Sequence, residues 1–376
     1  MCGTVGMFVG CAALTYCPKA LLTGGRVQRP ASGEVGAERA EQVEPEVAGT
    51  ELAEAGPAGS EEVKEEVEDP GYRSPFRGWY ERASVRRAPR RMVSEADAAL
   101  KFFSPDLVPV AGHPLVKALP ERVFGELLIQ HLYRYLDFTA QLEYLVVNRT
   151  VLGLAHGTVG LRLPEEMRFD ALKMYCDEAY HALFSVDLQR QVKGRTGVAP
   201  VLPAEPFFLR RLQQILEELP SSDKQLAELL FVIVSETLIS ASLAELPDTD
   251  EVVPAVREAI RDHATDEGRH HAYFATLLRH LWAQSDRQER RRIGVLVPRL
   301  MDAFLRPDLD ALKGELATYG LSRDEAEQVA AEVYSPEVVG AHSRATSRMT
   351  RRYFESAGAF AIPEAVDQLA VYGFVE

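Results

Sequence analysis

One apolar run constrains the fold more than any other feature of this sequence. Between Leu229 and Ile239 the chain carries a single charged residue, Glu236. A run this continuous is typical of a buried helix, and helical spacing places Glu236 on the same face as Val232 and Ile239. An ionised carboxylate without a partner in such a place loses several kcal/mol of hydration. Glu236 must therefore be protonated, paired with a cation or bound to a metal.

Acid–histidine sets mark two more helical segments. Glu178 and His181 stand three residues apart in the first of them. In the second, His263, Glu267 and His270 occupy positions i, i+4 and i+7. Both spacings place the members of a set on one face of a helix, where their side chains can act together.

A fourth segment carries an isolated acid, Glu143, in an otherwise apolar setting. In chain order the four segments supply Glu, Glu-x-x-His, Glu and Glu-x-x-His, which is the ligand pattern of a dinuclear carboxylate site in a ferritin-like bundle. Four glutamates match the charge of two divalent ions, and mixed oxygen and nitrogen ligands suit iron or manganese better than structural zinc. The candidate ligands from this pattern are Glu143, Glu178, His181, Glu236, Glu267 and His270.

Each part of this pattern has an ordinary structural explanation when taken alone. A single Glu-x-x-His is usually a surface pair, and an isolated buried acid is often salt-bridged. A buried polar network without metal would leave four carboxylates close together with strongly raised pKa values. The pattern favours a metal site because two pairs and two isolated acids fall on four separate helices in the right order. His271 points about 100° away from His270 and is left out of the ligand set.

Several residues next to the candidate ligands in the sequence are candidates for supporting the ligands or for packing around them. Asp177, Asp262 and Asp266 are each placed to accept a hydrogen bond from a ligating imidazole, or to be solvated helix charges. Tyr175 is expected to line a pocket or to fill the core. Cys176 is expected to face a neighbouring helix.

Helical periodicity dominates the chain after Val93, with no alternating strand pattern and no repeat of fixed period. We therefore predict an all-α fold, a ferritin-like helical bundle with additional helices around a four-helix core. Residues 1–70 are expected to be a disordered or poorly ordered extension, and residues 71–376 the folded domain. The expected helices span 120–151, 164–192, 221–246 and 254–282, with further ones near 285–305, 308–319, 322–334 and 336–356.

Charge and cysteine content exclude some classes of protein. The formal net charge is −14, and residues 34–69 alone hold 13 acidic and 2 basic residues, which leaves about −3 for the remainder. Such a balance argues against a protein dominated by nucleic-acid binding, and no uncharged apolar run is long enough for a membrane-spanning helix. The cysteines form neither a disulfide framework nor a paired zinc motif, so a cytoplasmic location is expected. They are Cys2, Cys11, Cys17 and Cys176.

Residues 73–91, called the arm below, interleave aromatic side chains with seven arginines and one acid, Glu81. Aromatic residues beside arginines can bind RNA. The alternative is an arm that packs on the helical domain and pairs with its acidic surface. The second interpretation is preferred.

The candidate ligands and their spacing resemble those of the diiron p-aminobenzoate N-oxygenases (AurF-like). The resemblance covers roughly residues 75–355 and includes the segment Pro109–Leu115 before the first candidate ligand helix. Its distinguishing part is His263, four residues before Glu267, which the resemblance implies is a third histidine ligand. The ligand set that it implies is Glu143, Glu178, His181, Glu236, His263, Glu267 and His270.

The resemblance also implies an activity. Two iron ions, with manganese as a possible substitute in vitro, would activate O2 and oxidise an aromatic amine from amine to hydroxylamine, nitroso and nitro compound. The substrate would be a small arylamine, free or tethered to a carrier. An external donor would supply electrons, because the chain shows no flavin or nicotinamide motif. The alternatives are C–H hydroxylation or desaturation at a similar site, and non-enzymatic iron binding. A homodimer is a further expectation.

Overall fold

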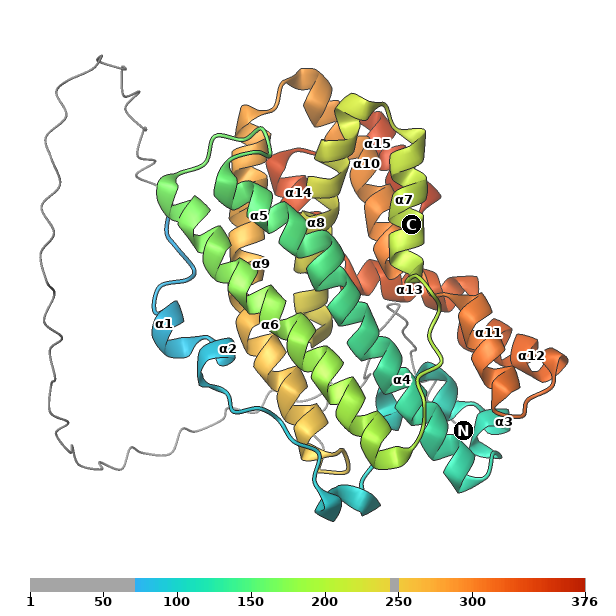
Figure 1. Cartoon of the computed structure of the whole chain (residues 1–376). Helices are drawn as coiled ribbons and strands as arrows, with labels where there is room; N and C mark the ends of the chain where they lie inside the picture. Colours follow the sequence, from blue (N-terminus) through green and yellow to red (C-terminus); the bar gives the residue numbers. More distant parts are fainter. Residues whose placement is uncertain (1–71, 244–249, 376) are drawn as a thin grey trace, which may run out of the picture. The chain divides into compact units, whose positions relative to one another are not determined.

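Four long helical segments lie side by side and form the core of the protein (Figure 1). The computed structural model describes residues 72–243 and 250–375, so the expectation for residues 1–70 lies outside the described residues. The all-α prediction is confirmed: the described part of the chain holds one isolated β-bridge, Lys101 to Val252, and no strand. The core segments are α4 (Glu121–Leu142), extended by α5 (Asn148–His156), α6 (Glu165–Thr196), α8 (Ser221–Leu243) and α9 (Pro254–Gln284).

The starts and ends of these helices follow from local chemistry. Pro164 precedes α6, and Glu165 and Glu166 occupy its first turn, where acids interact favourably with the helix dipole. Pro254 is the first residue of α9. At the end of α6, Gly197 adopts φ +73°, a left-handed conformation that favours glycine and ends the helix.

A π-helical turn joins α4 to α5. The sequence predicts one uninterrupted helix over 120–151, but residues Glu143–Val147 form the wider turn and the helix continues to His156. Such turns insert an extra residue into a helix and are common at functional sites. Glu143 is the first residue of this turn and is fully buried.

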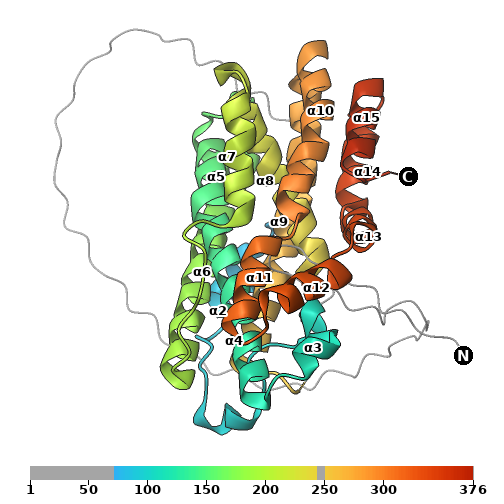
Figure 2. The same cartoon turned by 90° about the vertical axis from the view of Figure 1, so that its right-hand side faces the viewer.

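Further helices surround the core (Figure 2). The expected helix at 336–356 is wrong as a single element, because the chain breaks at Ser347 into α13 and α14. The helix at 207–218 and the last one were not expected. The long surrounding helices are α7 (Phe207–Glu218), α10 (Arg287–Leu305), α11 (Leu309–Thr318), α12 (Arg323–Val333), α13 (Pro336–Thr346), α14 (Arg348–Ala357) and α15 (Pro363–Val371).

The apolar run from Leu229 to Ile239 lies inside α8. Its side chains from Leu229 to Val234 are buried, and so is Glu236. Helix α8 contacts α9 along much of its length and is covered on its other side by α10. The prediction of a buried acid in an apolar helix is therefore confirmed. None of the helices that the structure describes is both long and apolar enough to cross a membrane.

The arm packs on α6 and α9, as the preferred interpretation predicts. Arg90 pairs with Asp187 of α6 at 2.7 Å, and Arg91 pairs with Asp262 of α9 at 2.8 Å. The arm contains two short helices, and four more short helices precede α4. They are α1 (Trp79–Arg82), α2 (Ser84–Arg87), η2 (Glu95–Ala99), η3 (Pro105–Leu107), η4 (Pro109–Gly112) and α3 (Pro114–Lys117).

Gly294 allows α10 to pack closely against the C-terminal segment. A Cβ atom at this position would clash with the carbonyl oxygen of Ala359 and press on Ala365. We expect Gly294→Ala to lower the free energy of unfolding by about 1–3 kcal/mol. The matched control is Gly314→Ala in α11, where a Cβ meets open space. It should raise stability by up to about 1 kcal/mol because alanine favours helix. Urea denaturation of both variants measures the difference, and equal midpoints would contradict this packing.

Candidate metal centre

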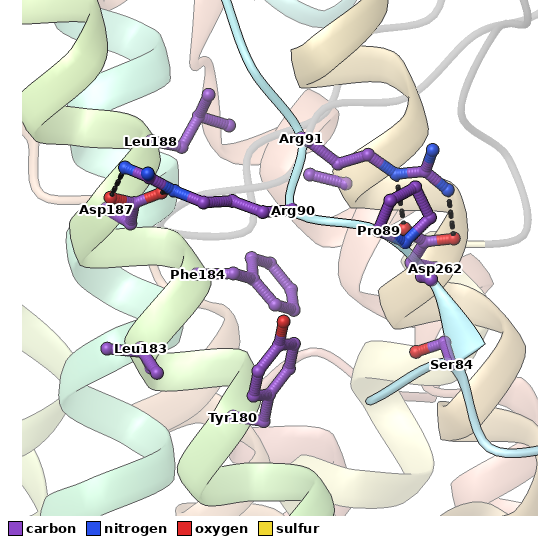
Figure 3. Close-up of a pocket in the computed structure, with 12 residues that line it drawn as sticks. Ser84, Pro89, Arg90, Arg91, Tyr180, Leu183, Phe184, Asp187, Leu188 and Asp262 are labelled. Carbon is purple, nitrogen blue, oxygen red and sulfur yellow. Dashed lines mark hydrogen bonds and ion pairs between the residues drawn. The ribbon is translucent and has the colours of Figure 1, made fainter. Parts of the chain in front are cut away.

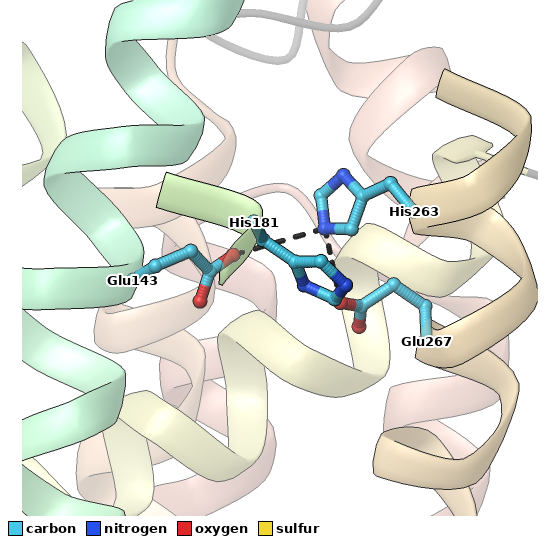
Figure 4. Close-up of side chains that lie close together, drawn as sticks. All are labelled: Glu143, His181, His263 and Glu267. Carbon is cyan, nitrogen blue, oxygen red and sulfur yellow. Dashed lines mark ion pairs between the residues drawn. The ribbon is translucent and has the colours of Figure 1, made fainter. Parts of the chain in front are cut away.

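Seven buried side chains from four helical segments converge inside the core. Glu143 comes from the π-helical turn and Glu236 from α8, while α6 and α9 supply the others. Figure 4 shows Glu143 reaching from one side towards His263 and Glu267 on α9, with His181 between them. The structure therefore brings together every residue of the set expected from the sequence: Glu143, Glu178, His181, Glu236, His263, Glu267 and His270.

The seven residues divide into two groups that share Glu267. In each group the four ligand-type atoms lie within 4.8 Å of one another. Glu267 Oε1 lies 3.0 Å from Nε2 of His263 in one group and 3.3 Å from Nδ1 of His270 in the other. The first group is Glu143, His181, His263 and Glu267, and the second is Glu178, Glu236, Glu267 and His270.

Glu178 also stands between the two groups. Its Oε2 lies 2.8 Å from Nδ1 of His181, and its Oε1 lies 2.6 Å from Nδ1 of His270. Glu178 and Glu267 thus each face both groups. Glu143 and Glu236 each face one group.

Two aspartates hold the far sides of the α6 and α9 imidazoles. Asp266 Oδ2 lies 3.3 Å from Nε2 of His181, and Asp177 Oδ2 lies 3.1 Å from Nε2 of His270. In both rings Nδ1 therefore faces the glutamates. A carboxylate behind an imidazole fixes the ring orientation and raises its basicity. Asp262, the third aspartate considered from the sequence, pairs instead with Arg91.

The arm supplies contacts that the sequence did not predict. Trp79 Nε1 donates to Asp177 Oδ1 at 2.8 Å. The Ser84 backbone N–H donates to Asp266 Oδ1 at 2.9 Å, and its hydroxyl donates to the other oxygen. Phe76 stacks on the ring of His270, with centroids 5.8 Å apart. One segment thus contacts both outer aspartates, and only its interleaved aromatic residues and arginines distinguished it in the sequence.

Burial and mutual repulsion favour the neutral form of two of the glutamates in the absence of metal. Burial raises the pKa of Glu143 well above its usual range, and the charges of Glu178 and Glu236 add to the effect. Burial likewise raises the pKa of Glu236, with Glu267 the next cause. A buried Tyr135 responds to the same acids: burial first, then Glu267 and Glu143, raise its pKa.

Nearby carboxylates favour the charged form of two of the histidines. Burial opposes the charged form of His181, but hydrogen bonds to Asp266 and Glu178 raise its pKa to about 10. The pKa of His270 is raised well above its usual range in the same manner, mainly by Glu178. Burial and the charge of His181 lower the pKa of His263.

The donor set fits two divalent cations. Raised pKa values at Glu143, Glu236, His181 and His270 favour bound protons at these groups in the absence of metal, and four protons carry the same charge as two divalent ions. Both oxygens of Glu143 are buried and lack a partner in hydrogen-bond geometry, as do both ring nitrogens of His263. Buried polar atoms in that state are costly unless something else binds them. Oxygen and imidazole donors are the types that iron and manganese accept.

A cavity of about 210 Å³ lies beside the arm on the histidine side of the centre. Figure 3 shows the rings of Tyr180 and Phe184 between α6 and the arm, below the Arg90–Asp187 pair. Phe184 closes its inner end, with ring centroids 5.6 Å from His181 and 6.1 Å from His263. Phe184 therefore separates the cavity from His181 and His263, and none of the seven side chains of the centre lines it.

Some expected neighbours do not reach the centre. Tyr175 and Cys176 are exposed, so the expectations of a pocket or core role for Tyr175 and of a helix contact for Cys176 are wrong. The buried face of α6 passes through Met174 and Glu178, which leaves both residues on the outer side. His271 bonds the hydroxyl of Tyr353 at 2.7 Å, outside both groups.

Comparison with known proteins agrees with this geometry. The sequence matches the family described as "P-aminobenzoate N-oxygenase AurF" over residues 74–358. It is also 28% identical over 268 residues to the 4-aminobenzoate N-oxygenase of Streptomyces thioluteus, an alignment that covers 68% of this chain and 79% of that protein. The matched residues contain all seven side chains of the centre. The chain belongs to the AurF family of p-aminobenzoate N-oxygenases.

Proposed function

We propose that residues 71–376 form a diiron oxygenase domain that uses O2 to oxidise the nitrogen of a small aromatic amine. The observation that carries the proposal is the pair of glutamates, Glu178 and Glu267, that each face both groups of ligand-type atoms. That arrangement favours two ions held close together rather than two separate sites. A bound iron pair would supply the electrons that reduce O2 and the oxidising power that acts on the amine.

The protein's own part in this reaction is to hold the ions, to orient the histidines that bind them and to exclude water. Asp177 and Asp266 orient His270 and His181, so the rings present Nδ1 to the ions. Complete burial excludes water from the centre. Five of the seven residues come from α6 and α9, while only Glu143 and Glu236 come from the opposite pair of segments. The side of the centre towards α4 and α8 therefore holds fewer side chains of the set, and we propose that the amine nitrogen approaches from there.

The substrate class rests on the family. The Streptomyces thioluteus relative is named as acting on 4-aminobenzoate. We infer that the substrate of the present chain is a single-ring arylamine, which is oxidised stepwise to the hydroxylamine, nitroso and nitro compounds. Each step adds oxygen or removes hydrogen at the same nitrogen, so one binding position can serve the whole sequence.

The ligand role of Glu236 can be tested without an assay of activity. Ferrous iron or manganese at about 100 times its dissociation constant should stabilise the wild-type chain by about 2.7 kcal/mol for each bound ion. Glu236→Gln should leave the metal-free thermal midpoint nearly unchanged, because a neutral acid and an amide have similar shape, and should abolish most of the metal effect. The control is Glu228→Gln on the same helix, outside both groups, which should keep the full effect. Differential scanning calorimetry measures both, and a full metal effect in Glu236→Gln would contradict the assignment.

The proposed reaction is tested with chemically reduced, iron-loaded protein, ¹⁸O2 and a panel of aminoarenes. Mass spectrometry should find ¹⁸O on nitrogen, as hydroxylamine, nitroso or nitro product. Glu178→Ala should lose the activity by more than roughly 100-fold, since even partners of metal ligands typically matter 10–100-fold. Glu166→Ala, an exposed acid on the same helix, should retain it. A product with ¹⁸O on carbon would instead indicate a hydroxylase. A product that has lost hydrogen to form a double bond would indicate a desaturase. Ferric mineral without organic product would indicate iron binding alone.

A further inference from the structure

A short relay of side chains connects the arm to the metal centre. Trp79 Nε1 donates to Asp177 Oδ1 at 2.8 Å, and Asp177 Oδ2 lies 3.1 Å from Nε2 of His270. Nδ1 of the same histidine lies 2.6 Å from Glu178 within the centre. The outer end of the relay is an aromatic ring that is 8% exposed. One carboxylate and one imidazole therefore separate that ring from Glu178 of the centre.

The surface around Trp79 is strongly basic. The ring of Tyr80, which is 55% exposed, meets the Trp79 ring edge-on with centroids 5.2 Å apart. The Arg86 guanidinium lies over both rings, at 5.6 and 5.2 Å. Arg77 and Arg82 are exposed beside them, and Arg82 donates to the Arg77 carbonyl at 3.2 Å.

These arginines differ from the two at the end of the arm. Arg90 and Arg91 are paired with acids of α6 and α9. Arg77, Arg82 and Arg86 form no ion pair within the described part of the chain. The arm holds seven arginines against one acid in a chain whose net charge is −14. Unpaired positive charge gathered on the outer end of a relay is suited to a negatively charged partner.

We propose that this basic face of the arm docks a small acidic electron carrier of the iron–sulfur ferredoxin class, and that Trp79, Asp177 and His270 conduct its electron to the metal pair. The inference rests on the proposed function, which needs an external reductant. Each docked carrier gives up one electron as its own iron–sulfur cluster is oxidised. Two carriers in succession reduce two ferric ions to two ferrous ions, and no covalent bond is formed or broken.

The position of the relay separates electron entry from oxygen chemistry. His270 and Asp177 lie on the α6 and α9 side, whereas Glu143 and Glu236 approach from the opposite side. A carrier bound on the arm would therefore leave the approach of O2 and the amine unobstructed. Continuous contact through aromatic rings and hydrogen bonds gives an electron a better path than a gap of the same length.

The docking half of the proposal is tested by binding a plant-type [2Fe–2S] ferredoxin to the full-length, iron-loaded protein. Affinity measured by calorimetry should fall at least about 10-fold in Arg77→Gln/Arg82→Gln/Arg86→Gln, and wild-type affinity should fall steeply with salt because the contact is electrostatic. A control with the same loss of charge is Arg279→Gln/Arg287→Gln/Arg352→Gln, at exposed positions on other helices. It should bind as the wild type does. Equal affinity of both triple variants would overturn the proposal.

The conducting half is tested with Trp79→Phe, which keeps an aromatic ring and removes the donor to Asp177. Iron content is checked first, and the variant is compared at full loading. Stopped-flow absorbance should show reduction by ferredoxin at least about 10-fold slower, with ferredoxin affinity unchanged and reduction by dithionite unchanged. A slowing that is equal with both reductants would mean that Trp79 acts only through the structure of the centre, and an unchanged ferredoxin rate would exclude the relay.

Two other occupants of the basic face give different results. A single-stranded RNA that binds as tightly as ferredoxin and displaces it would overturn the proposal in favour of nucleic acid. The second alternative occupant is the acidic segment 34–69 of the same chain, which also carries complementary charge. Wild-type protein that binds no ferredoxin at low salt would overturn the proposal in favour of that segment. Product formed after dithionite reduction separates this inference from the proposed function. If that product forms normally while ferredoxin fails, the relay is wrong and the oxygenase stands.

Discussion

Four glutamates in the dry interior of one bundle impose the electrostatic constraint on which the rest of the structure depends. Their charge cannot be left uncompensated, because burial and mutual repulsion both penalise it. Raised pKa values at Glu143, Glu236, His181 and His270 favour protons that meet this need when metal is absent. Two divalent ions would meet it with the same total charge, which explains why the acids and histidines occur as one set.

The constraint extends outward from the centre to the surface. Imidazoles that bind ions need fixed orientation, and Asp177 and Asp266 provide it. These aspartates are themselves buried and need donors, which the arm supplies through Trp79 and Ser84. A segment far from the ligands in sequence thereby becomes part of the site. It also places the basic face of the arm next to Trp79, which donates to Asp177.

The sequence predicted the centre better than its surroundings. Glu236 stood out because it is the single charge in the apolar run from Leu229 to Ile239, and the order of acids and histidines along the chain indicated which residues would meet. Trp79 and Ser84 could not be found in that way, because their bonds span 98 and 182 residues and no local pattern encodes them. The exposure of Tyr175 was missed because spacing alone does not define where the buried face of a long helix is centred.

The central claim is that seven side chains hold a pair of ions, and iron stoichiometry tests it most directly. The metal-free, full-length protein would be loaded with excess ferrous salt under argon and desalted, and its iron content compared with protein concentration. The account predicts about two ferrous ions per chain, as expected for two shared groups of carboxylate and imidazole donors. Retention of less than about one ion per chain would contradict it.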